Sequence, residues 1–414
     1  MKVLRRSRWL ARLAGCTALT LGMAGTAAAS APAQARVTGI LFQSHVVASW
    51  GFNSDGDLGD GTTTDRSRYG DISALGNDMV QVSAGYYFGL ALRGDGTVWA
   101  WGSNGSGQLG DGTTTSRSTP VRVTGLTGVT QVAAGGAFSL ALRSDGTVWA
   151  WGGNGIGQLG HGTTSDHELA PVQVTGLTGV TKISAGAGFS LALRSNGTVW
   201  AWGDNRYGEL GNGTTVSSSV PVKVAGLSYA TGIAAGYDAA VATQTNGISA
   251  ISSVWTWGGN SSGQLGDGTL TGHSTPERVA GINNVYFAGV TAGLWTAAVL
   301  GTDGSVWSWG NDTAGQLGNA PASSPVTRPV NTIAAGSRIT QLSAGWGHML
   351  ALRSDGTVLA WGSNTGGQLG IGSTVPVAGP VQVTGLTAVS QVSAGGRAFS
   401  LAVHTVPWLV GQSS

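Results

Sequence analysis

The chain has 414 residues, of which 71 are glycine and only 10% are charged, and its formal net charge is +2. So much glycine excludes a mainly helical protein and suits many tight turns between short strands. The small charge, with no basic patch or arm in the body of the chain, argues against nucleic-acid binding, which needs a positive footprint.

Residues 1–35 are predicted to be a secretory signal peptide. A basic region with five Lys and Arg residues precedes a mostly apolar stretch at 13–24, and an Ala-rich segment follows at 27–35, which is the usual layout of such a signal. The candidate cleavage sites follow Ala29, Ala31 and Ala35. We therefore expect a secreted, extracellular protein.

The only cysteine, Cys16, lies within this segment. Residues 13–16 (LAGC) resemble a lipidation box, but the apolar run follows the box instead of preceding it, so we expect no lipid anchor. Cleavage after Ala35 leaves 16 basic and 19 acidic residues, a net charge of −3, and no disulfide. No other apolar run is long enough to span a membrane.

Seven copies of one motif occupy the rest of the chain. An apolar stretch ends in Trp-Gly, and a Leu-Gly pair follows each time. The Trp-Gly pairs begin at Trp50, Trp101, Trp151, Trp202, Trp257, Trp309 and Trp361. Regular spacing of this length indicates that one supersecondary unit repeats, so the recurring Trp residues are expected to be core.

One complete unit can be followed between residues 131 and 180. Residues 131–135 and 138–143 (FSLALR) are predicted strands, and Asp145-Gly146 is a predicted hairpin turn. Residues 147–151 (TVWAW) form a third strand. A long polar loop is expected over 152–170, followed by an edge strand at 171–174 that contains Pro171.

Four antiparallel strands repeated seven times predict an all-β, seven-bladed β-propeller over residues 36–405, with a C-terminal tail at 406–414. The first Trp-Gly copy lacks the strand and turn that precede the others, and the last copy, 391–404, lacks a Trp-Gly strand. We therefore expect the strand around residues 45–50 to complete that last blade and close the ring.

The repeat SAGxxFSLALRSDGTVWAWG, followed by GQLGDGTT and a Pro-Val strand, resembles the regulator of chromosome condensation repeat family. The resemblance covers about residues 37–405 and implies a seven-bladed propeller closed by strands from both termini. The founding members of this family are nuclear exchange factors for a small GTPase and bind chromatin. We do not expect guanine nucleotide exchange here, because the mature chain is predicted to be exported and acidic.

A nearer resemblance is to the secreted bacterial propellers of this family, which include a β-lactamase inhibitor protein. It implies that one face of loops is presented to a protein partner. This chain differs in its long GDGTT segments, and it keeps the His that often follows Ser-Ala-Gly only at His348. Phe88, Phe138 and Phe189 stand at that position elsewhere.

In an up-and-down meander, alternate turns lie on the same side. The two residues after each Ser-Ala-Gly and the loop after each Trp-Gly should therefore share one surface, which we call the loop face. Aromatic, Arg and Asp side chains gathered on a rigid face are typical of interface hot spots. The predicted partner-binding residues are Tyr86, Tyr87, Asp204, Arg206, Tyr207, Tyr237, Asp238, Trp295, Trp346 and Arg397.

We predict no metal site and no cofactor. The loops at Asp60, Asp111, Asn212 and Asp267 are interpreted as turns, since Asp and Asn suit turns. Asn53, Asp55 and Asp57 have an alternate acidic spacing, but Leu58 stands where a calcium loop needs Gly. His161 and His167 are expected to share one solvated loop with Asp166 and Glu168.

We find no P-loop, and we expect no enzyme activity. The preferred interpretation is an exported, monomeric protein-binding propeller, a scaffold or an inhibitor-like module with an unknown protein partner. One alternative is a propeller that binds cell-wall polysaccharide or another carbohydrate through its Tyr and Trp side chains. A second alternative is an enzyme with a site at the channel mouth.

Overall fold

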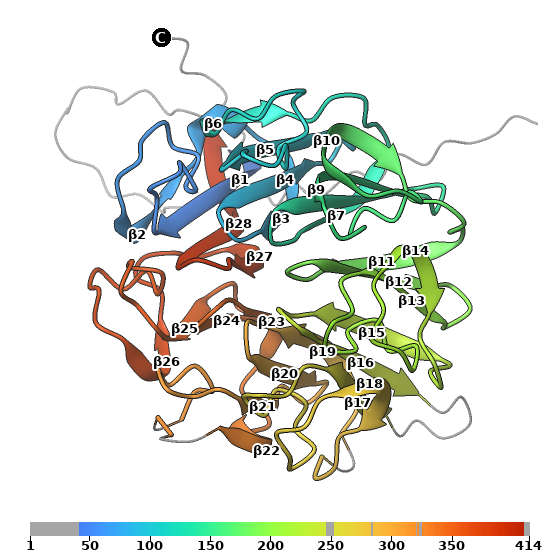
Figure 1. The fold of residues 1–414 in the computed structure, drawn as a ribbon. Coiled ribbons are helices and arrows are strands. Elements are labelled where there is room, and N and C mark those ends of the chain that lie inside the picture. Colours follow the sequence, from blue (N-terminus) through green and yellow to red (C-terminus); the bar gives the residue numbers. More distant parts are fainter. Residues whose placement is uncertain (1–40, 246–251, 283–284, 320, 323–324, 410–414) are drawn as a thin grey trace, which may run out of the picture.

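The computed structural model describes residues 41–245, 252–282, 285–319, 321–322 and 325–409. Within these residues, strands β1 to β28 form seven sheets of four antiparallel strands each, arranged around a ring in chain order (Figure 1). This arrangement confirms the predicted seven-bladed β-propeller. No helix in the described part of the chain is long and apolar enough to cross a membrane.

Each sheet is one blade, and we number the blades from the sheet that contains β1. Blade 1 consists of β27 (Val389–Ala394), β28 (Phe399–Leu409), β1 (Leu41–Gly51) and β2 (Arg66–Asp71), with the 3-10 turn η1 (Ser73–Leu75) after it. Blade 2 consists of β3 (Met79–Ala84), β4 (Phe88–Arg93), β5 (Val98–Gly102) and β6 (Arg117–Arg122). Blade 3 consists of β7 (Val129–Ala134), β8 (Phe138–Arg143), β9 (Val148–Asn154) and β10 (Ser165–Gln173).

The other four blades repeat this order. Blade 4 consists of β11 (Val180–Ala185), β12 (Phe189–Arg194), β13 (Val199–Gly203) and β14 (Ser218–Lys223). Blade 5 consists of β15 (Ala230–Ala235), β16 (Ala239–Thr245), β17 (Ser252–Gly258) and β18 (His273–Arg278). Blade 6 consists of β19 (Phe287–Ala292), β20 (Thr296–Gly301), β21 (Val306–Gly310) and β22 (Val326–Ile333). Blade 7 consists of β23 (Ile339–Ala344), β24 (His348–Arg353), β25 (Val358–Gly362) and β26 (Val377–Gln382).

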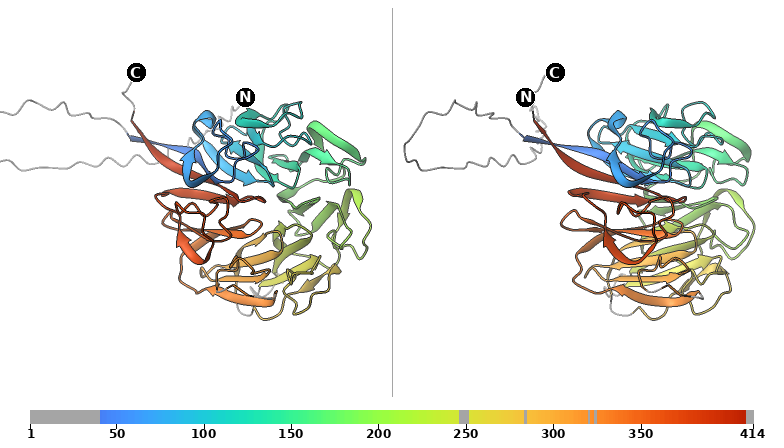
Figure 2. Two further views of the ribbon diagram at one scale, coloured as in Figure 1. Left: turned by 60° about the vertical axis from the view of Figure 1, so that its left-hand side comes forward. Right: turned by 90° about the vertical axis from the view of Figure 1, so that its left-hand side faces the viewer.

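Blade 1 is built from both ends of the chain, as the sequence predicts. β1 pairs with β28 over its whole length, from Leu41 opposite Leu409 to Gly51 opposite Phe399. The outer ends of these two strands project from the ring (Figure 2). β28 thus continues to Leu409, past the predicted start of a tail at 406, because β1 supplies a hydrogen-bonding partner there. The predicted signal peptide lies outside the described residues.

The seven repeat Trp side chains join neighbouring blades. Each is fully buried, and burial of such a ring contributes roughly 2–3 kcal/mol. Each indole N–H donates to a backbone carbonyl of the preceding blade, for example Trp151 Nε1 to Gln108 O at 2.9 Å. The Gly of each Leu-Gly pair packs under that ring: Gly110 has φ +65°, and a Cβ there would lie 2.8 Å from the ring of Trp151.

One local prediction needs correction. The loop expected over 152–170 is shorter, because β9 runs to Asn154 and β10 begins at Ser165 and pairs back to it. In the Asp-Gly turns, only Gly has a positive φ, as at Gly96, while Asp95 Oδ1 accepts bonds from the Thr97 N–H and hydroxyl. Asn246-Gly247, where the repeat predicts a turn of the same kind, lies outside the described residues.

Candidate binding face

The loop face is assembled in the same way in every blade. The residue after each Trp-Gly pair donates its backbone N–H to the carbonyl of the residue just before the second strand of the blade, as in Ser103 N to Tyr87 O at 2.8 Å. Equivalent bonds occur in all seven blades. The two sets of loops that the sequence assigns to one face are therefore held side by side.

Three of the predicted aromatic residues gather at the mouth of the central channel. Tyr86 and Tyr237 are stacked with ring centroids 6.3 Å apart, and Trp346 meets Tyr86 edge-on at 5.0 Å. The channel beyond them has a volume of about 70 Å³ and is lined mainly by the Ala-Gly ends of the inner strands. Burial raises the pKa of Tyr86, so its hydroxyl stays neutral.

Arg397 lies between two aromatic rings. Its guanidinium carbon is 4.8 Å from the ring centroid of Phe52 and 5.2 Å from that of Tyr87. Its Nη1 donates to the Tyr87 hydroxyl at 3.3 Å. Such cation–π contacts hold the exposed guanidinium in one place.

A groove of about 490 Å³ runs across blades 6, 7 and 1 on this face. Trp295, Trp346 and Phe52 provide its apolar surface, and Arg397 lies at its blade 1 end. Amide and hydroxyl side chains complete the lining, namely Asn311, Thr313, Gln316, Ser363, Thr365 and Gln368. The combination of an apolar surface with a few placed polar groups is typical of a binding site.

The remaining predicted residues differ in what they expose. Asp204 is buried and pairs with Arg206 at 2.6 Å, while the Arg206 side chain is 72% exposed. Tyr207, beside them, is 54% exposed. Asp238 is buried and accepts a bond from Gln264 Nε2 at 2.9 Å. Arg206 and Tyr207 are therefore available to a partner, whereas the carboxylates of Asp204 and Asp238 hold the side chains of Arg206 and Gln264 in place.

Two buried acids lie under the loop face. Asp57 and Glu209 stand at the position where the other five blades carry Gln, and each accepts a backbone N–H two residues earlier. Desolvation by burial raises the pKa of each carboxyl to about 7. Asp57 Oδ1 has no hydrogen-bonding partner among the described residues.

The polar loops after Trp-Gly have a structural role. The buried Asn53 amide donates to Thr62 O and Thr64 O, and its Oδ1 accepts from the Leu58 N–H. Asp60 Oδ1 accepts from the Thr62 N–H and hydroxyl. These bonds confirm the interpretation of the loops as turns.

His161 and His167 do not form a cluster. His161 lies 3.6 Å from a Glu168 carboxylate oxygen, but His167 lies on β10 with an exposed side chain. The prediction that they share one loop is therefore wrong, because β10 begins at Ser165.

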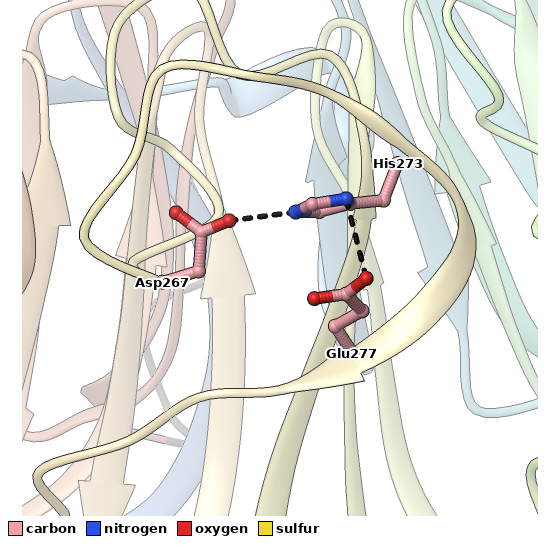
Figure 3. Close-up of side chains that lie close together, drawn as sticks. All are labelled: Asp267, His273 and Glu277. Atoms are coloured by element: carbon pink, nitrogen blue, oxygen red, sulfur yellow. Dashed lines mark hydrogen bonds and ion pairs between the residues drawn. The ribbon is translucent and has the colours of Figure 1, made fainter.

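A different His cluster occurs in blade 5, which the sequence analysis did not single out. His273 lies between Asp267 and Glu277 (Figure 3). Its Nε2 is 2.6 Å from Asp267 Oδ2, and its Nδ1 is 3.3 Å from Glu277 Oε1. One ligand atom from each of the three residues lies within 4.8 Å of the others, but the two carboxylates approach opposite ring nitrogens, which favours an ion-pair arrangement. In blades 1 and 2 the same position holds an Arg that pairs with the loop Asp.

Phe52 is the site residue that the sequence analysis missed. It follows Trp50-Gly51, where the other blades carry Ser, Gly, Asp or Asn. The sequence did contain a sign of its role, because Phe52 is aromatic at a position that is polar or Gly in the other blades.

The chain matches the RCC1-like domain over residues 31–336 and 128–412. It is 33% identical to the ultraviolet-B receptor UVR8 of Arabidopsis thaliana over 343 residues, which cover 81% of this chain and 77% of that protein. It is 33% identical to the probable E3 ubiquitin-protein ligase HERC6 of Homo sapiens over 245 residues, 58% of this chain but only 24% of HERC6.

Solved structures support the same fold. Prp20p of Saccharomyces cerevisiae superimposes with a TM-score of 0.75 at 24% identity, covering 90% of this chain and 93% of that chain. Human WBSCR16 gives a TM-score of 0.76 at 24% identity, with 87% and 98% covered. The resemblance noted in the repeats is thereby confirmed, and the chain belongs to the RCC1-like domain family.

Proposed function

We propose that this protein is an exported, monomeric interaction module that binds a protein partner, as a scaffold or an inhibitor, through its loop face. The observation that carries the proposal is the groove on that face, where Trp295 is 38% exposed beside the anchored Arg397. Trp and Arg are enriched among the residues that dominate protein interfaces. Tyr207, Arg206 and Tyr237 extend the same surface across blades 4 and 5.

The relatives support an interaction role. The structural study of Prp20p describes its binding properties to Gsp1p and histones, and UVR8 is named as a receptor. Propellers of this family therefore include proteins that bind other proteins. Our proposal transfers only this coarse role, because the partner depends on side chains that differ between family members.

A non-enzymatic role is part of the proposal. The channel lining is Ala, Gly, Leu and aromatic side chains, and among the described residues no carboxylate or imidazole lines it. The buried acids with raised pKa, Asp57 and Glu209, line neither this channel nor the groove. A catalytic acid or base has to reach its substrate, so neither acid is favoured for that role.

The test is a binding experiment with mature protein. Immobilised protein would be exposed to secreted proteins of the source organism and, separately, to purified cell wall. A loop-face variant would carry Tyr207→Ala, Tyr237→Ala and Trp295→Ala. The control would carry Tyr229→Ala and Tyr286→Ala, which remove similarly exposed Tyr side chains from the opposite face.

We expect one protein to be captured by the parent and the control but not by the loop-face variant. Retention on cell wall alone would instead favour the carbohydrate-binding alternative. Equal capture by all three proteins would refute the loop face as the binding surface. Circular dichroism and melting temperature would establish that both variants are folded.

A further inference from the structure

The turn that carries Arg397 is longer than its counterparts. Three residues separate the first two strands in blades 2 to 7, as between Ala344 and His348, but four separate Ala394 from Phe399. The additional residue places Ala398 at φ +55°, a conformation that costs energy for a residue other than Gly. The turn thus departs from the repeat at the point where it presents Arg397.

The Arg397 guanidinium lacks an acidic partner among the described residues. None of the ion pairs in the described part of the chain includes it. By contrast, Arg66, Arg117 and Arg206 all pair with a loop Asp. Arg397 is held by Phe52 and Tyr87 instead, which leaves its outward N–H groups free to bind an external acceptor in a fork geometry.

The groove beside Arg397 also presents a donor. Asn311 Oδ1 accepts bonds from the Thr313 N–H, the Thr313 hydroxyl and Gln316 Nε2. The Asn311 NH₂ group has no partner of its own among the described residues. Trp295 and Phe52 line the same groove and provide its apolar surface.

We propose that the groove receives a peptide segment of the protein partner in which an Asp or Glu side chain pairs with Arg397 and a neighbouring apolar side chain packs on Trp295. This inference rests on the proposed function and specifies the partner's chemistry. A planar guanidinium recognises a carboxylate through two parallel hydrogen bonds. A polyanion is disfavoured, because the carboxylate of Asp65 lines the same groove.

The test uses mature protein and an array of blocked short peptides. The central residue of each peptide is Glu, Asp, Gln, Asn or Lys, and its neighbours are Leu, Phe, Trp or Ser. The proteins compared are the parent, Arg397→Gln, Arg397→Lys, Trp295→Ala and the control Arg122→Gln, which removes an exposed cation from the outer strand β6.

We expect the parent and Arg122→Gln to bind Glu or Asp peptides with apolar neighbours at least about tenfold more tightly than their amide counterparts. Arg397→Gln should bind the acid and amide peptides equally, and Arg397→Lys should keep only part of the preference. Trp295→Ala should lose the preference for apolar neighbours.

The inference is overturned if no peptide of the array binds, if Glu and Gln peptides bind equally to the parent, or if Arg397→Gln keeps the acid preference. Any of these results would leave the proposed function intact, provided that the loop-face variant still fails to capture the protein partner in the binding experiment. If the peptide array fails and the loop-face variant also still captures the protein partner, the loop face is refuted as a binding surface.

Discussion

At the scale of single residues, Asp57 and Glu209 depart from the repeat in a way that lowers folding stability at high pH. Where the other blades carry a neutral Gln, these two carboxyls are buried with pKa values raised to about 7. A carboxyl with a raised folded-state pKa contributes stability that is fully present below its unfolded pKa. That contribution is lost as the pH rises through the folded pKa.

The first prediction is that Glu209→Gln and Asp57→Asn stabilise the protein at pH 8. The gain should shrink as the pH falls from about 7 to about 4, the window between the folded and unfolded pKa values. Each unit of raised pKa corresponds to about 1.4 kcal/mol at high pH. Melting temperatures measured across this range provide the check, with the exposed Asp166→Asn as control. A gain independent of pH would contradict the explanation.

For His348 we predict that folding stability depends on pH in the opposite direction. It is buried, its Nε2 lies 3.0 Å from Ser400 Oγ, and burial lowers its pKa to about 4. A lowered His pKa makes the folded state lose stability as the pH falls below the unfolded value of about 6.5. His348→Phe, which restores the residue of Phe88 and Phe138, should reduce the loss of stability between about pH 6 and 4. Urea unfolding at both pH values would measure it, and an unchanged loss would argue against the assignment.

At the scale of elements, side chains on the inner strands hydrogen-bond to the backbone of the next blade and hold neighbouring blades together. We call each such side-chain-to-backbone contact a clasp. The Gln391 amide bonds both the N–H and the carbonyl of Val82 in the next blade, and Gln81, Gln131 and Gln341 do the same. Hydroxyls form a second clasp, as Ser83 Oγ accepts the Ala134 N–H at 2.9 Å. Between blades 5 and 6, Gly232 and Ala234 stand at these two positions, so neither clasp occurs there.

We predict that Ala234→Ser stabilises the propeller. The new hydroxyl can accept the Ala292 N–H as Ser343 accepts that of Ala394, and a net hydrogen bond contributes about 0.5–1.5 kcal/mol. Chemical denaturation would measure the gain. The reverse change Ser343→Ala should cost a similar amount, and stabilisation by both changes would exclude the clasp as the cause.

The outer strand β18 of blade 5 provides a test of the His cluster that it carries. Because His273 replaces an Arg that pairs with the loop Asp in blades 1 and 2, we predict that it is an ion-pair position and not a metal ligand. His273→Arg should keep the parent melting temperature, whereas His273→Ala should lower it. Added zinc or chelator should leave the parent unchanged. A zinc-dependent rise that His273→Ala abolishes would establish a metal site instead.

The whole molecule depends on closure by its two ends. β1 and β28 pair along eleven residues, and without β1 the inner strands of blade 1 would expose an edge to other chains. We predict that deleting residues 36–50 causes aggregation and lowers the melting temperature. Light scattering and calorimetry on the truncated protein would test this. A monomeric truncated protein with an unchanged melting temperature would show that closure is dispensable.

The fold could be predicted from the sequence because each blade has the same packing requirements, so the same residue types recur at the same positions of every repeat. The Trp and Leu residues equivalent to Trp101 and Leu109 recur in every blade, so the number of blades followed from their spacing. Closure of the ring followed from the incomplete first and last copies. Strand ends were less accessible: β10 begins at Ser165, well before the predicted edge strand at 171–174, because its partner β9 extends to Asn154.

The sequence by itself also identified which loops share a face, since alternation along a meander requires it. Only the tertiary structure decided which predicted residues face a partner. Asp204 and Asp238 turn their carboxylates to Arg206 and Gln264. Arg397 is anchored between Phe52 and Tyr87 and forms no ion pair within the described residues. The physical reason is that a repeat period fixes the backbone position of each residue, whereas burial and pairing depend on side chains from neighbouring blades that are distant in sequence.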